Sequence, residues 1–160
     1  MVAQGQPILR RCITPRAWIS ISACIQLSGL AFDATWHGLV NPGFEAATLS
    51  QMIRHLASVH LLLYIGVVSV LLSTGWALLD QIRRGERGLA LPVAFAGAVL
   101  STAGEAWHAY EHLQLSTTHS AAIAGSTAFI GLVIVVAALW ASRHEERSRR
   151  AADRERRRVA

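Results

Sequence analysis

Apolar residues are gathered into four long stretches that are separated by short polar connectors. Each stretch is close to the roughly 20 residues that a helix needs to cross the hydrocarbon core of a bilayer. They cover residues 17–40, 56–79, 89–113 and 121–141. Because the connectors are short, consecutive helices should be antiparallel neighbours. The pattern therefore predicts an all-α integral membrane protein, with a single four-transmembrane-helix antiparallel bundle over residues 17–141.

The composition agrees with a membrane protein and leaves no room for a separate soluble domain. The chain has 160 residues, of which 52% are apolar and only 16% are charged, and its mean hydropathy is +0.37. A soluble domain usually has about a quarter of its residues charged. We therefore expect a multi-pass protein of the plasma (inner) membrane, with the lipid bilayer as its main partner.

The positions of the arginines predict how the chain is oriented. The net charge of +5 comes from arginine alone, because the chain contains no lysine. Three arginines precede the first apolar stretch, three lie in the connector between the second and third, and eight follow the fourth. Only Arg54 falls on the opposite side. The positive-inside rule then places both termini in the cytoplasm.

The two ends of the chain are predicted to be cytoplasmic segments outside the bundle. Residues 1–16 form a short basic leader, and residues 142–160 form an arginine-rich tail. The tail has acidic and basic residues at i,i+4 spacing, which favours a solvated helix. Anionic lipid would attract such a tail, and we expect no nucleic acid partner.

The third apolar stretch carries an unusual polar stripe near its end. Ser101, Glu105, His108 and His112 follow one another at spacings of four, three and four residues. On a helix these positions share one face. Ionisable side chains are costly in hydrocarbon, so they usually point into the protein and have partners there. This face should therefore look into the bundle.

The first apolar stretch carries a matching stripe. Ser22, Gln26, Gly29, Asp33 and His37 lie at spacings of four, three, four and four residues. They too share one helical face. The stripe ends in an Asp-x3-His pair at the outer side of the membrane, so it should meet the stripe of the third stretch inside the bundle.

Once the chain is oriented in this way, six of its seven histidines fall at one outer level of the membrane. In the second stretch we expect His60 to face the interior. His55 lies five residues earlier, about 140° around a continuous helix, so it should be interfacial instead. His119 begins the fourth stretch, and His144 alone is cytoplasmic.

Histidine and carboxylate together are the ligand set of iron, copper and zinc, and a helix bundle can collect them from facing helices. Asp33-x3-His37 and His108-x3-His112 each place two donors one turn apart, and Glu105-x2-His108 has the spacing seen in di-iron bundles. We therefore predict a mono- or dinuclear metal site, with iron or copper favoured over zinc. The candidate ligands are Asp33, His37, His60, Glu105, His108, His112 and His119. The sequence leaves the contributions of Glu45, His55 and Glu111 open.

Several functions fit this prediction. The first is a metal-dependent oxidoreductase that acts on a small or lipidic substrate. A b-type haem electron carrier would use two of the histidines as axial ligands, with Gly97 and Gly125 leaving space for the group. An intramembrane zinc hydrolase would use three histidines and a carboxylate base. A non-enzymatic metal- or proton-handling subunit, within a larger membrane complex or a homo-oligomer, is the fourth.

The Asp33-x3-His37 pair followed by a later histidine resembles the copper-binding region in the C subunit of membrane methane and ammonia monooxygenases. The abundance of histidine also resembles that of membrane hydroxylases. Both resemblances imply a metal site in the membrane. The spacings after His37 differ from the first family and the histidine boxes of the second are absent, so we assign the chain to neither.

Overall fold

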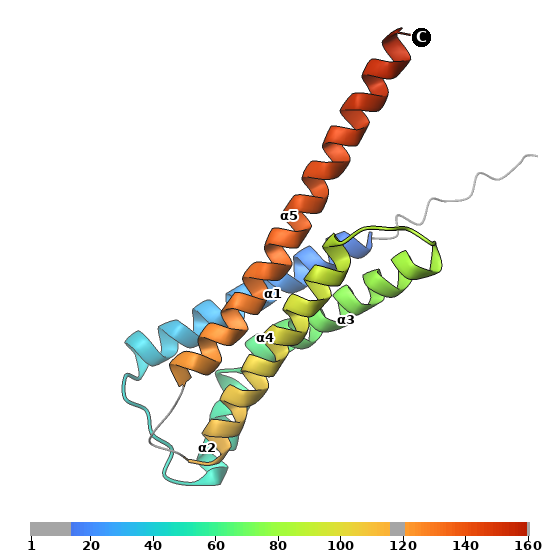
Figure 1. The fold of residues 1–160 in the computed structure, drawn as a ribbon. Coiled ribbons are helices and arrows are strands. Elements are labelled where there is room, and N and C mark those ends of the chain that lie inside the picture. Colours follow the sequence, from blue (N-terminus) through green and yellow to red (C-terminus); the bar gives the residue numbers. More distant parts are fainter. Residues whose placement is uncertain (1–13, 116–120, 160) are drawn as a thin grey trace, which may run out of the picture.

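The computed structural model describes residues 14–115 and 121–159, and within these ranges every regular element is a helix. Four long helices form a bundle, with a short helix at one end (Figure 1). The elements are α1 (Pro15–Thr35), the π-helix η1 (Trp36–Val40), α2 (Leu49–Ser58), α3 (Leu61–Arg83), α4 (Ala90–Leu113) and α5 (Ala121–Val159). The helix α5 projects far beyond the others, at the end of the bundle opposite α2 (Figure 1).

Three segments are long and apolar enough to cross a membrane, namely Pro15–Val40, Leu61–Arg83 and Ile123–His144. The structure is therefore that of a multi-pass membrane protein with three candidate spans. The helix α4 has 24 residues, which is long enough. Its mean hydropathy is lower than that of the three apolar spans, because its second half carries Glu105, His108 and His112 of the polar stripe. The fourth span and the placement of the termini stay predictions.

The helices α1 and α3 run antiparallel and touch through two glycines. A methyl group on Gly29 would overlap the backbone of Leu63, and one on Gly66 would overlap the backbone of Gln26. Small residues of this kind let the backbones of membrane helices approach closely, where packing stabilises the pair. The contact fixes Asp33, one turn beyond Gly29, against the start of α3.

The helices α4 and α5 form a second close pair. A methyl group on Gly97 would lie 2.7 Å from the carbonyl oxygen of Gly131, and one on Gly104 would lie 2.9 Å from that of Ala124. The small residues of the third stretch thus admit a neighbouring helix. As a result, α5 fills the space beside Gly97 in which the haem alternative would have needed room.

The two pairs are joined across the bundle by a buried hydrogen bond. Gln26 Nε2 of α1 donates to Ser101 Oγ of α4 over 2.7 Å. Both residues belong to the predicted polar stripes, and both are buried. The prediction that these faces meet inside the bundle is confirmed. Below this bond lies an apolar core formed by Ile19, Ala23, Val70, Ala77, Ala98, Leu132, Val135 and Leu139.

The predicted helix over residues 56–79 is wrong at its beginning. The helix α2 ends at Ser58 and α3 begins only at Leu61, so the chain turns at Val59 and His60. A separate N-terminal cap starts α2, because Thr48 Oγ1 accepts a hydrogen bond from Gln51 N. The segment before α3 is therefore a distinct short helix across the end of the bundle, in contact with α3 and α4.

Candidate metal centre

Five histidines meet at the end of the bundle where α2 lies. They come from η1, α2, the residue before α3 and the last turns of α4, and we call them the histidine cluster: His37, His55, His60, His108 and His112. We call this the histidine end of the bundle. The opposite end is called the arginine end, after Arg16, Arg83, Arg84 and Arg143.

The first group of ligands consists of His37, His55 and His60. One ring nitrogen of each lies within 4.8 Å of those of the other two. The Nε2 atoms of His55 and His60 are 3.2 Å apart. Two histidine nitrogens bound to one tetrahedral ion are about 3.3 Å apart, given metal–nitrogen bonds of about 2.0–2.1 Å. The separation of this pair therefore suits ligands of a single ion.

The second group consists of His60, His108 and His112, with ligand atoms again within 4.8 Å of one another. The Nε2 atoms of His108 and His112 are 3.0 Å apart. Their i,i+4 spacing on α4 places both rings on the same face. His60 belongs to both groups. Because one imidazole nitrogen binds a single ion, His60 completes only one group at a time, and a second neighbouring ion would need a further donor such as a carboxylate.

A half-buried carboxylate, Asp33, and a buried one, Glu105, lie beside the cluster but outside both groups. Asp33 Oδ1 is 3.3 Å from His60 Nδ1 and 3.5 Å from His37 Nε2. These distances allow ion pairs, although the geometry of neither contact is that of a hydrogen bond. Glu105 is only 4% exposed, and its Oε2 has no hydrogen-bond partner among the described residues. Carboxylates placed in this way can orient metal-binding histidines and balance a metal's charge.

Two further aromatic rings lie against His55. Its ring centroid lies 4.5 Å from that of Phe44 and 4.6 Å from that of Trp36. The two covering rings also contact each other edge to face. His55 itself is only 4% exposed, so these rings help to shield it from water.

Burial makes His55 a neutral ligand at physiological pH. The cost of placing a charge in this apolar setting, followed by repulsion from His37 and His108, lowers the pKa of His55 to about 4. A metal ligand must be unprotonated, so an ion need not displace a proton from His55 at pH 7.

The structure brings most of the candidate ligands close together. Asp33, His37, His60, His108 and His112 all contribute to or contact the cluster, and Glu105 is buried in the same helix face. His119 lies outside the described residues. Glu45 belongs to neither ligand group, and Glu111 accepts a hydrogen bond from Trp107 Nε1.

The expectation that His55 is interfacial is wrong. It assumed one continuous helix through His55 and His60, whereas the turn at Val59 lets both rings face inward. The sequence did contain a signal, because Met52, His55 and Val59 have the three- and four-residue spacing of a buried helical face. All three are buried.

Comparisons with protein-family models, with curated proteins and with solved structures find no match to the chain. The functional assignment therefore rests on the geometry of the histidine cluster.

Proposed function

We propose that the protein is a multi-pass membrane metalloprotein whose histidine cluster binds iron or copper as a mono- or dinuclear centre. The observation that carries this proposal is the pair of ligand groups that share His60, each with its three nitrogens within 4.8 Å. Three histidines on one ion leave coordination positions open, as in catalytic rather than structural sites. A redox-active ion there would serve an oxidoreductase whose substrate is small or lipid-soluble.

The ligand types support a transition metal. Neutral imidazoles suit copper, iron and zinc, whereas calcium and magnesium prefer more oxygen ligands. An ion surrounded by neutral rings in a low-dielectric site also needs negative charge nearby. Asp33 and Glu105 supply it. The burial of Glu105 supports this role, since a buried carboxylate without a cation is costly.

A bare ion fits the cluster better than a haem. The ring of His60 has the rings of five residues around it, at centroid distances between 4.9 and 5.8 Å. These residues are His37, His55, Tyr64, His108 and His112. A porphyrin could not enter between His60 and any of them without displacing the ring, so we favour metal binding without a macrocycle.

For the topology, we propose four spans with both termini in the cytoplasm, so that the histidine end faces the extracytoplasmic side. The helix α4 runs antiparallel to its neighbour α5 and reaches the cluster with His112. It must therefore cross the same thickness as the three apolar spans. The arginine end carries most of the described arginines, which favours the cytoplasmic side for that end.

The direct test is metal analysis of protein purified in mild detergent, with elemental mass spectrometry and an absorption spectrum. We expect one or two equivalents of iron or copper. The His60→Ala variant should lose most of the metal, because it removes the shared ligand. His144→Ala is the matched control, since His144 lies at the arginine end beside Trp140, and it should retain the metal.

Three results would contradict the proposal. A wild-type protein that holds no transition metal and binds none on addition would exclude a metal site. A protein that binds only zinc would exclude the redox function. A Soret band in the absorption spectrum would show that the protein binds haem instead of a bare ion.

A further inference from the structure

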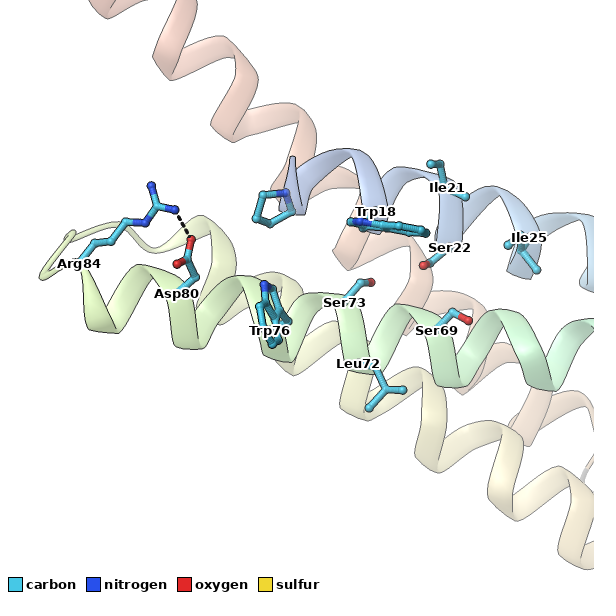
Figure 2. A pocket seen from close by; sticks show the side chains of 11 residues that line it. Trp18, Ile21, Ser22, Ile25, Ser69, Leu72, Ser73, Trp76, Asp80 and Arg84 are labelled. Atoms are coloured by element: carbon cyan, nitrogen blue, oxygen red, sulfur yellow. Dashed lines mark ion pairs between the residues drawn. The ribbon is translucent and has the colours of Figure 1, made fainter. Parts of the chain in front are cut away.

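A groove between α1 and α3 opens at the arginine end, far from the histidine cluster. It has a volume of about 670 Å³ and is lined only by residues of these two helices and by Arg84. Figure 2 shows Trp18 and Ser22 of α1 and Ser73 of α3 around the space, with Asp80 and Arg84 at one end.

The groove follows from where the two helices touch. Their backbones are in contact at Gly29 and Gly66, in the half of the bundle near the histidine cluster. Towards the arginine end the groove is lined by large side chains such as Trp18, Leu72 and Trp76. The gap is therefore a wedge that closes near the middle of the bundle.

We propose that this groove binds one acyl chain of an anionic phospholipid, whose headgroup phosphate lies at Arg84. Both walls belong to candidate membrane spans, so the groove is bathed in lipid. From Asp80 to Ser69, its lining extends about 16 Å along α3 at the helical rise of about 1.5 Å per residue. This is close to half of the roughly 30 Å hydrocarbon core of a bilayer. The groove thus has the depth of one leaflet.

The mouth of the groove lies at the arginine end of the two helices. Arg84 Nη2 pairs with Asp80 Oδ2 at 2.8 Å, yet the Arg84 side chain is 62% exposed. A guanidinium has several N–H donors, so it can hold this carboxylate and a phosphate together. Arg16 and Arg83 lie at the same ends of α1 and α3. Anionic headgroups would be attracted there.

The lining of the groove suits an acyl chain better than a polar ligand. The hydroxyl of Ser73 already donates to the carbonyl oxygen of Val70, and the other walls are mainly apolar. Trp18 and Trp76 near the mouth are typical of residues at the membrane interface. A membrane-spanning helix of a partner could not occupy the groove along its length, because the wedge closes at Gly66.

Tryptophan quenching tests the proposal on the full chain. The protein is reconstituted in phosphatidylcholine vesicles that contain a small fraction of phosphatidylglycerol with brominated acyl chains. We expect quenching that saturates at a low mole fraction of this lipid. The same fraction of brominated phosphatidylcholine should quench weakly and without saturation.

Variants locate the bound lipid. The saturating component should disappear in the double variant Trp18→Phe/Trp76→Phe and persist in Trp140→Phe. Trp140 is a matched control, because it is 67% exposed, against 66% for Trp76, and lies on α5. Arg84→Gln should raise the half-saturating mole fraction about fivefold, which corresponds to one basic contact with anionic lipid. Arg54→Gln, at the histidine end, should leave it unchanged.

A groove-filling change gives an independent readout. Ser69 lines the groove at a half-buried position, so Ser69→Phe should fill the groove and abolish saturation without changing the metal content. Non-saturating quenching that is equal for the two lipids, or that is located at Trp140, would overturn the proposal. So would quenching that disappears as the protein-to-lipid ratio rises, since a second copy of the chain would then fill the groove.

Discussion

Replacing Asp33 by asparagine keeps the size of the side chain and removes its charge beside the cluster. Asp33 contacts His60, which is shared by both ligand groups, and His37, which belongs to the first. The change should therefore weaken the binding of every ion that the cluster holds. Loss of a carboxylate that orients a metal-binding histidine typically lowers metal affinity about 10- to 100-fold.

A Coulomb calculation gives a consistent magnitude. With a divalent ion on His60 Nε2, the carboxylate near Nδ1 would lie roughly 7 Å from the ion, given a metal–nitrogen bond of about 2 Å and the width of the ring. The attraction is then about 5 kcal/mol at an effective dielectric constant near 20 and about 1 kcal/mol in water. The expected loss of 10- to 100-fold corresponds to about 1.4–2.7 kcal/mol, which lies between these limits.

The assay is a competition titration against a chelator of known affinity, in detergent. Asp80→Asn is the matched control, because Asp80 is a half-buried carboxylate at the arginine end that pairs with Arg84. We expect it to leave the metal affinity unchanged. If Asp33→Asn binds metal as tightly as Asp80→Asn does, Asp33 neither orients nor balances a metal, and the charge argument is refuted.

Three further predictions concern other parts of the molecule. His55→Ala should lower metal affinity in the same titration, whereas Arg54→Gln, one position away and exposed, should not. Equal affinities of the two variants would show that His55 is not a metal ligand. Gly66→Ala should destabilise the fold by about 1–3 kcal/mol, because a methyl group there overlaps the backbone of Gln26. The matched change Gly125→Ala meets nothing within 4 Å and should not lower the thermal midpoint; equal midpoints would contradict the close packing of α1 and α3. The pKa of His55 is lowered to about 4 in the fold, so the unfolded chain takes up its proton first as the pH falls. The contribution of neutral His55 to the stability of the metal-free protein should then be fully present above about pH 6.5 and be lost between about pH 6.5 and 4. In thermal melts, His55→Ala should flatten part of this decrease of the melting temperature with falling pH. An unchanged dependence of the melting temperature on pH would show that His55 is not buried as described.

The sequence pattern predicted the parts of the structure that depend on local spacing. The polar stripes through Gln26 and Ser101 meet because side chains of that kind cannot face lipid, and spacings of three and four residues place them on one helical face. The close contact of α4 with α5 at Gly97 follows from a similar local rule, since only a small residue lets a second backbone approach.

The parts that it missed depend on tertiary contacts. No strong breaking residue marks Val59 and His60, so the turn between α2 and α3 could not be read from periodicity. Ring contacts of His55 with Trp36 of η1 and His112 of α4 help to hold α2 across the end of the bundle. The groove between α1 and α3 was also missed, because it arises from the distance between two helices and has no signature in either one.

The central claim is that imidazoles of the histidine cluster hold a transition metal, and X-ray absorption at the edge of the bound metal tests it most directly. We predict a first coordination shell dominated by nitrogen at about 2.0–2.1 Å, with the outer-shell scattering of imidazole rings and no sulfur. This signal should be lost in His60→Ala and retained in His144→Ala. A shell of oxygen without imidazole, or a spectrum unaffected by His60→Ala, would contradict the account.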